Sequence, residues 1–62
     1  MKWNELRRIA EERGWRLFKH GARHDLYRHP EHPEWGILTI GRHGSEEVKT
    51  GTCSKIRKQI GF

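Results

Sequence analysis

The sequence contains almost none of the cysteine that small secreted domains need, and no long apolar run. Cys53 is the single cysteine among 62 residues, so no intramolecular disulfide can form. No apolar stretch approaches the roughly 18 residues of a transmembrane helix, and the first residues lack the apolar segment of a signal peptide. The sequence therefore predicts a cytoplasmic protein that does not associate with membranes.

Length leaves room for one core only, because a chain of this size buries about 60% of its unfolded surface. We therefore expect a single domain over residues 1–62. Charged residues make up 34% of the sequence and hydrophobic residues 32%, which is polar for a globular domain. Three Trp, one Tyr and two Phe can still supply a core, which favours a small folded module over a disordered chain.

Acidic residues are scarce relative to basic ones, and the C-terminal quarter has none. Thirteen Lys and Arg against eight Asp and Glu give a net charge of +5 and a pI near 10.0. From residue 49 onward the charged side chains are Lys49, Lys55, Arg57 and Lys58. This distribution indicates an anionic partner such as RNA, DNA or an acidic protein, and a merely solvated basic face fits it equally well.

Glycine and proline divide the chain into five short elements. The first is a helix with Asn4 as its N-cap, Leu6 on its apolar face, and Gly14 at its C-terminal end. Three strands are expected at 15–19, 24–29 and 35–40, with the two prolines in the loop between the second and third.

The last element is a second helix that begins near Thr50, whose hydroxyl can cap it, and ends at Gly61. Cys53, Ile56 and Ile60 repeat at helical spacing and form its apolar stripe. The order is α-β-β-β-α, and the fold class is α+β: two helices on one face of a three-stranded antiparallel sheet, as in double-stranded-RNA-binding domains. Architecture of this kind does not by itself establish a function.

Histidine is abundant, with five in the chain, and no Ser-His-Asp or Cys-His order suggests a hydrolytic nucleophile. A zinc site is not favoured, because Cys53 stands alone and His24 and His29 point to opposite faces of a regular strand. No metal or cofactor is expected. We interpret His20, His29 and His32 as structural or solvated residues.

His24 is the candidate for chemistry. It opens the second strand and shares an alternation with Leu26, which is expected in the core. That placement predicts a histidine at the rim of the covered face of the sheet, where a substrate can reach it.

The order and spacing of several short motifs resemble the HicA-type toxins, messenger-RNA-cleaving ribonucleases of bacterial toxin–antitoxin systems. The motifs are Gly14-Trp15, Gly21-Ala22-Arg23-His24, Tyr27-Arg28-His29-Pro30, Lys49-Thr50-Gly51-Thr52 and Ile56-Arg57-Lys58-Gln59-Ile60-Gly61. The resemblance implies the double-stranded-RNA-binding fold, a HicB-type antitoxin as partner, and catalysis by the Gly-x-x-His histidine, here His24. Two positions differ from the family pattern: Ala22 replaces a usual Ser, and Gly41 replaces a Pro that often precedes the pair Arg42-His43.

A histidine can cleave RNA without a metal, because an imidazole can accept the proton of the 2′-hydroxyl and supply one to the leaving 5′-oxygen. Cations must then stabilise the charge that develops on the phosphorus. The candidate RNA-binding residues fall into two groups. Lys19, Arg23 and Arg42 are proposed as neighbours of His24, and Lys49, Lys55 and Lys58 lie on the basic C-terminal segment.

Two other functions remain open at this point. A non-catalytic double-stranded-RNA-binding module would retard RNA without shortening it, and a protein–protein adaptor would have no RNA affinity. The three tryptophans could stack on bases, but packing explains them better: Trp15 in the core, Trp3 on the first helix and Trp35 over the open sheet face. Cys53 is likewise expected to be a packing residue.

Overall fold

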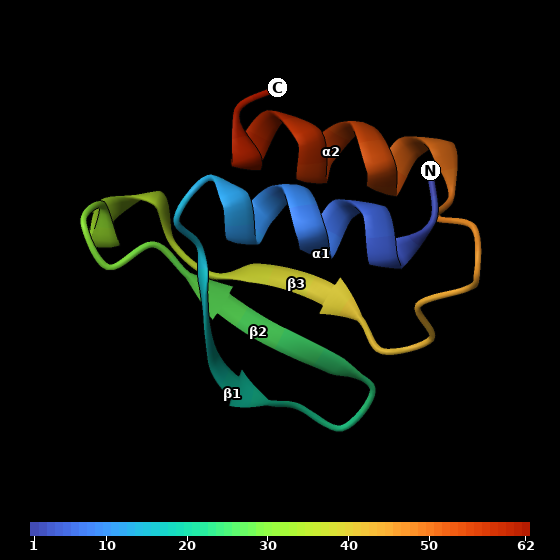
Figure 1. Cartoon of the computed structure of the whole chain (residues 1–62), viewed down its shortest axis with the longest axis horizontal. Coiled ribbons are helices and arrows are strands. Elements are labelled where there is room, and N and C mark those ends of the chain that lie inside the picture. The colour runs from blue at the N-terminus through green and yellow to red at the C-terminus, as the bar shows by residue number, and fades with distance from the viewer.

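The computed structural model describes all 62 residues and confirms the predicted order of elements (Figure 1). The elements are α1 (Trp3–Glu12), β1 (Arg16–His20), β2 (His24–Arg28), the short 3₁₀ helix η1 (Pro33–Trp35), β3 (Leu38–Gly41) and α2 (Thr50–Ile60). Neither long helix has the length and apolar character that crossing a membrane requires.

The three strands form an antiparallel meander in the order β1-β2-β3. The two helices run side by side in the same direction along β3, and β1 is the strand farthest from them (Figure 1). All five residues of β1 are exposed, whereas β2 and β3 alternate between buried and exposed positions. The chain is therefore α+β, as predicted.

One hydrophobic core joins both helices to the sheet. Its largest fully buried side chains are Trp15, Tyr27, Leu6, Leu38 and Ile40. The predicted stripe of α2 is buried in the same cluster, so Cys53 is a packing residue, as expected. Trp15 also lies in the core, although it precedes β1 rather than belonging to it.

The predicted helix ends are correct, and the predicted caps at the helix starts are wrong. Gly14 and Gly61 both have positive φ, at 98° and 106°, a region that glycine enters without a Cβ clash. Helix α1, however, begins at Trp3 with Lys2 as N-cap, not at Asn4. Helix α2 begins at Thr50, but no side chain caps it, and the Lys49 carbonyl accepts the first N–H instead, from Cys53.

The third strand is shorter than predicted. Residues 33–35 form η1 and the strand begins only at Leu38, so the expected start at Trp35 is wrong. Trp35 does not cover the open face of the sheet. Its ring lies 5.9 Å from that of Trp15 and stacks on His32 at 4.0 Å, beyond the end of β2.

The expected core residue of the second strand also needs correction. Asp25 and Tyr27 are the buried residues of β2, while Leu26 is only half-buried and lies opposite Thr39 of β3, which is exposed. His24 shares the alternation of Leu26, but at the end of the strand its ring lies beside Trp3 of α1 and borders a hollow lined by α2. Leu26 was expected inside because it is apolar, whereas the charged Asp25 is the buried residue.

Candidate functional site

His24 opens β2 at the end of a tight turn. The N–H of Gly21 donates to the carbonyl of His24 at 2.8 Å, and a Cβ at Gly21 would lie 2.9 Å from that carbonyl oxygen, so only glycine fits without a shift. The His24 side chain is exposed, and its imidazole makes no hydrogen bond within the chain. Both ring nitrogens are therefore available to a ligand.

Two hollows meet at His24. The smaller, of about 420 Å³, is bounded by the sheet and by α2; the larger, of about 800 Å³, lies towards the loops before β2 and after β3. Trp3 borders both hollows, and its ring faces that of His24 edge to face, with the centroids 6.4 Å apart. A Cβ at Gly41 would lie 2.7 Å from the Trp3 ring, so the bare backbone of Gly41 allows the indole to lie there.

A buried carboxylate lies directly behind this site. Asp25 accepts hydrogen bonds from His20 Nδ1 at 2.7 Å, from Arg7 Nη1 at 3.0 Å and from Arg42 Nε at 3.0 Å. These donors, the His20 imidazole first and Arg42 next, hold the pKa of the Asp25 carboxyl well below its usual range, although burial opposes them. Asp25 is therefore ionised in the fold, and its lone pairs are occupied.

Arg7 extends this network into the core. Its guanidinium also donates to the Tyr27 hydroxyl at 2.9 Å and to the carbonyl of Gly41 at 3.1 Å. Burial raises the pKa of Tyr27. Helix α1 is thus joined through Arg7 to both of the strands that frame the site.

Arg42 joins the loop after β3 to the turn before β2. Besides Asp25, its guanidinium reaches the carbonyls of Gly21 and Ala22. The segment that carries His24 and the segment that carries His43 are therefore held to each other by one side chain.

The candidate RNA-binding residues separate into two groups in space. Arg23 and Arg42 border the large hollow, Lys55 borders the small one, and Lys49 borders both. The acidic Glu46 also borders both, and Glu47 borders the small hollow. Lys19 and Lys58 border neither. The structure thus brings four of the six residues together around His24.

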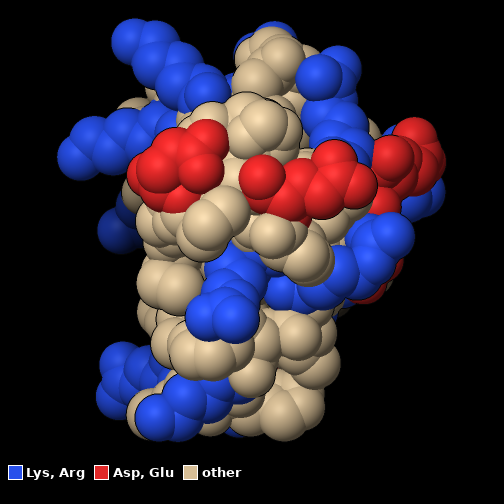
Figure 2. All heavy atoms as spheres, turned by 90° about the vertical axis from the view of Figure 1, so that its left-hand side faces the viewer, with Lys and Arg blue, Asp and Glu red and all other residues tan.

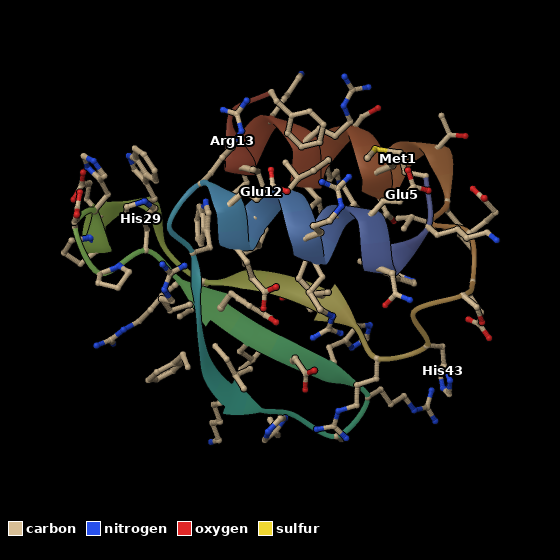
Figure 3. All side chains as sticks on the ribbon, in the orientation of Figure 1. Met1, Glu5, Glu12, Arg13, His29 and His43 are labelled. Atoms are coloured by element: carbon tan, nitrogen blue, oxygen red, sulfur yellow. The ribbon has the colours of Figure 1, made fainter.

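Histidines at the other end of β2 have a different setting. His29 is buried, its Nε2 lies 3.0 Å from the carbonyl of Arg13, and its Nδ1 accepts the N–H of Glu31 at 3.3 Å. Figure 3 places His29 at the η1 end of the molecule, opposite His43. Figure 2 faces the η1 end and shows acidic side chains interleaved with Lys and Arg.

The whole chain apart from its first two residues matches the family model for the HicA toxin of bacterial toxin–antitoxin systems, over residues 3–62. The chain belongs to the HicA toxin family. No curated protein matches its sequence significantly. The resemblance inferred from the motifs is thereby confirmed.

Sequence reasoning missed three residues that lie at or behind the hollows around His24. Asp25 and Arg7 pair across 18 positions, a contact that only the strand register reveals. His43 borders the large hollow beside His24, although its sequence context distinguishes it only as part of the pair Arg42-His43. The available signal was an aspartate inside a predicted strand, next to Leu26, with His20 at the end of the preceding strand as a possible partner.

Proposed function

We propose that this HicA-family toxin is a metal-independent endoribonuclease that cleaves messenger RNA in the cytoplasm, with His24 as its catalytic residue. The observation that carries the proposal is the exposed imidazole of His24, free of intramolecular hydrogen bonds, at the point where two hollows meet. Basic side chains border both hollows, as a polyanionic ligand requires. Two exposed nitrogens suit acid–base work on a hydroxyl and a phosphate ester.

The proposed reaction is transesterification. The 2′-oxygen attacks the adjacent phosphorus, the bond to the 5′-oxygen breaks, and the products end in a 2′,3′-cyclic phosphate and a 5′-hydroxyl. Arg23 and Lys49 border the hollow where the charge on the phosphorane would develop. DNA would be inert, because it lacks the internal nucleophile.

The first test compares three end-labelled oligonucleotides of one sequence: all RNA, all DNA, and DNA with a single ribonucleotide. The toxin should shorten the RNA, leave the DNA intact and cut the third strand only at the ribonucleotide, with or without EDTA. His24→Ala should lower the cleavage rate about 10²- to 10⁴-fold. A folded His24→Ala variant that still cleaves at the wild-type rate would contradict the assignment.

His32→Ala is the matched control, since it also removes one partly exposed imidazole but at the far end of the molecule, and it should cleave normally. RNA that is retarded on a gel but never shortened by the wild-type toxin would instead identify a non-catalytic double-stranded-RNA-binding module. Loss of cleavage in EDTA would indicate a metal-dependent reaction.

We also propose that a HicB-type antitoxin silences the toxin by covering His24. A standard antitoxin patch of about 800 Å² would cover a little under a fifth of the 4366 Å² that the chain exposes, and the basic residues that border the hollows favour placing that patch over His24. Acidic antitoxin side chains would complement the basic residues there and speed association at low salt. Histidine modification of His24 should therefore be slower in the complex, and RNA and antitoxin should compete; equal reactivity in both states would require an allosteric mechanism.

A further inference from the structure

Cleavage by an internal 2′-oxygen involves two proton transfers on opposite sides of one phosphorus. The attacking and leaving oxygens lie roughly in line with the phosphorus between them, so a group placed to take the proton of the first is poorly placed to give one to the second. His24 can serve one of these positions. The large hollow contains a second imidazole that could serve the other.

That imidazole belongs to His43. It borders the same 800 Å³ hollow as His24, and its ring makes no hydrogen bond within the chain. In the sheet, His24 lies opposite Gly41, so His43 follows only two residues beyond the position that faces His24. The backbone turn at His43 is closed, because its carbonyl accepts the N–H of Glu46 at 3.0 Å.

Arg42, which directly precedes His43, ties the segment that carries His43 to the segment that carries His24. The Arg42 guanidinium is held by the buried carboxylate of Asp25 and donates to the carbonyls of Gly21 and Ala22, in the turn that leads into His24. Two mobile surface loops would place their histidines independently. Here one hydrogen-bonded side chain couples the two segments, as a preorganised pair requires.

We infer that His43 is the second acid–base group of this site and donates the proton to the leaving 5′-oxygen; the inference rests on the proposed ribonuclease function. His24 takes the proton of the 2′-hydroxyl as the bond from the 2′-oxygen to phosphorus forms. His43, as imidazolium, gives its proton to the 5′-oxygen as the bond from phosphorus to that oxygen breaks. Exchange of one proton with water on each imidazole then restores the starting state.

The hollows that each histidine borders decide which one accepts the 2′-hydroxyl proton and which one donates to the 5′-oxygen. His24 borders both, so the nucleotide that carries the attacking 2′-hydroxyl can place its base in the smaller hollow beside Trp3. His43 borders only the larger hollow, into which the departing strand runs. The charged groups around His43 in this hollow are Arg23, Arg42, Glu46 and Lys49, together with the imidazole of His24.

The test uses two substrates that differ in the leaving group: an RNA dinucleotide, whose 5′-alkoxide needs a proton, and a nucleoside 3′-(4-nitrophenyl phosphate), whose phenolate does not. His43→Ala should lower kcat on the dinucleotide about 10²- to 10⁴-fold and on the aryl ester less than about threefold. His24→Ala should lower kcat on both substrates, since both need the 2′-hydroxyl deprotonated.

The pH profile supplies a second readout. Wild-type kcat/KM on the dinucleotide should be bell-shaped, and His43→Gln should lose the alkaline limb while keeping the acidic one. Equal losses on both substrates would overturn the inference by making His43 a binding or structural residue, and so would normal dinucleotide cleavage by His43→Ala. If the wild-type toxin cleaves neither substrate, the proposed ribonuclease function itself has failed. If the wild-type toxin cleaves the dinucleotide and His43→Ala cleaves it equally well, only the role of His43 as proton donor is refuted.

Discussion

The two ends of β2 each carry a histidine, and the two side chains have opposite surroundings. At the η1 end, His29 is buried and both its ring nitrogens are occupied, one by the carbonyl of Arg13 and one by the N–H of Glu31. At the hairpin end, His24 is exposed and neither ring nitrogen has a partner within the chain. His43, visible in Figure 3 far from His29, shares the unpaired state of His24.

This contrast shows that the hydrogen-bond partners of an imidazole, and not its presence, decide whether the ring is free to exchange protons with a ligand. With Nδ1 of His29 accepting an N–H, its Nε2 must carry the proton that is donated to Arg13, which fixes one neutral tautomer. A histidine held in that way cannot exchange protons with a substrate. An unpaired imidazole such as that of His24 remains free to do so, provided that its backbone is held rigidly.

The largest effect is expected from Asp25→Asn, which removes the charge that holds the hairpin end together. The amide would leave the cations of Arg7 and Arg42 without their shared carboxylate, and its NH₂ group would face donors. We expect the free energy of unfolding to fall by about 2–4 kcal/mol. Urea unfolding followed by circular dichroism measures this loss, and a loss below about 0.5 kcal/mol would show that the network does not stabilise the fold.

The effect of pH on this variant has a definite sign. Because the pKa of Asp25 is lowered in the fold, its ionised form stabilises the protein above the unfolded carboxyl value of about 3.9, and this stabilisation is lost as the pH falls below it. Below about pH 4 the difference in stability between wild type and Asp25→Asn should therefore shrink as the pH falls. A difference that grows over that range would contradict the assignment.

The Asp25 network also shows where sequence-based prediction stops. Helical spacing, terminal glycines and alternation predicted all five main elements and selected His24, since these are local patterns. A buried charge violates the pattern of apolar residues inside, so the alternation wrongly predicts Leu26, and not Asp25, in the core. Arg7, Asp25 and Arg42 meet only once the register is known, and no local signal specifies it.

The second prediction compares alanine substitutions of the histidines at the two ends of β2. His29→Ala should lower the free energy of unfolding by about 1–3 kcal/mol, because it leaves the Arg13 carbonyl and the Glu31 N–H without a partner and opens a space beside Trp15. His24→Ala should change it by less than about 0.5 kcal/mol, as at an exposed position. Thermal unfolding of both variants tests this directly, and similar losses at the two positions would break the contrast between structural and reactive histidines.

A smaller effect is expected at Gly41, where the backbone of β3 approaches Trp3. An added Cβ would lie 2.7–2.9 Å from three atoms of the indole, so Gly41→Ala must displace the ring. We expect a loss of about 1 kcal/mol in stability and an altered fluorescence spectrum, because Trp3 moves relative to solvent. Gly51→Ala is the control, since nothing lies within 4 Å of its Cβ; an unchanged spectrum in Gly41→Ala would mean that Trp3 does not depend on Gly41.

The smallest expected effect distinguishes Lys55 from Lys58, for which the sequence predicts the same role. Lys55 and Lys58 lie about one turn apart on α2, but Lys55 borders the hollow beside His24, whereas Lys58 borders a separate hollow beside Trp35. If RNA binds at the hairpin end, Lys55→Gln should reduce the slope of log affinity against log salt by about one unit or less, and Lys58→Gln should leave it unchanged. Binding of RNA to His24→Ala, which should not cleave it, measures both slopes in the same background. Equal reductions would place the RNA along the whole of α2, and a reduction only for Lys58 would move the binding surface to the end where the histidines are structural.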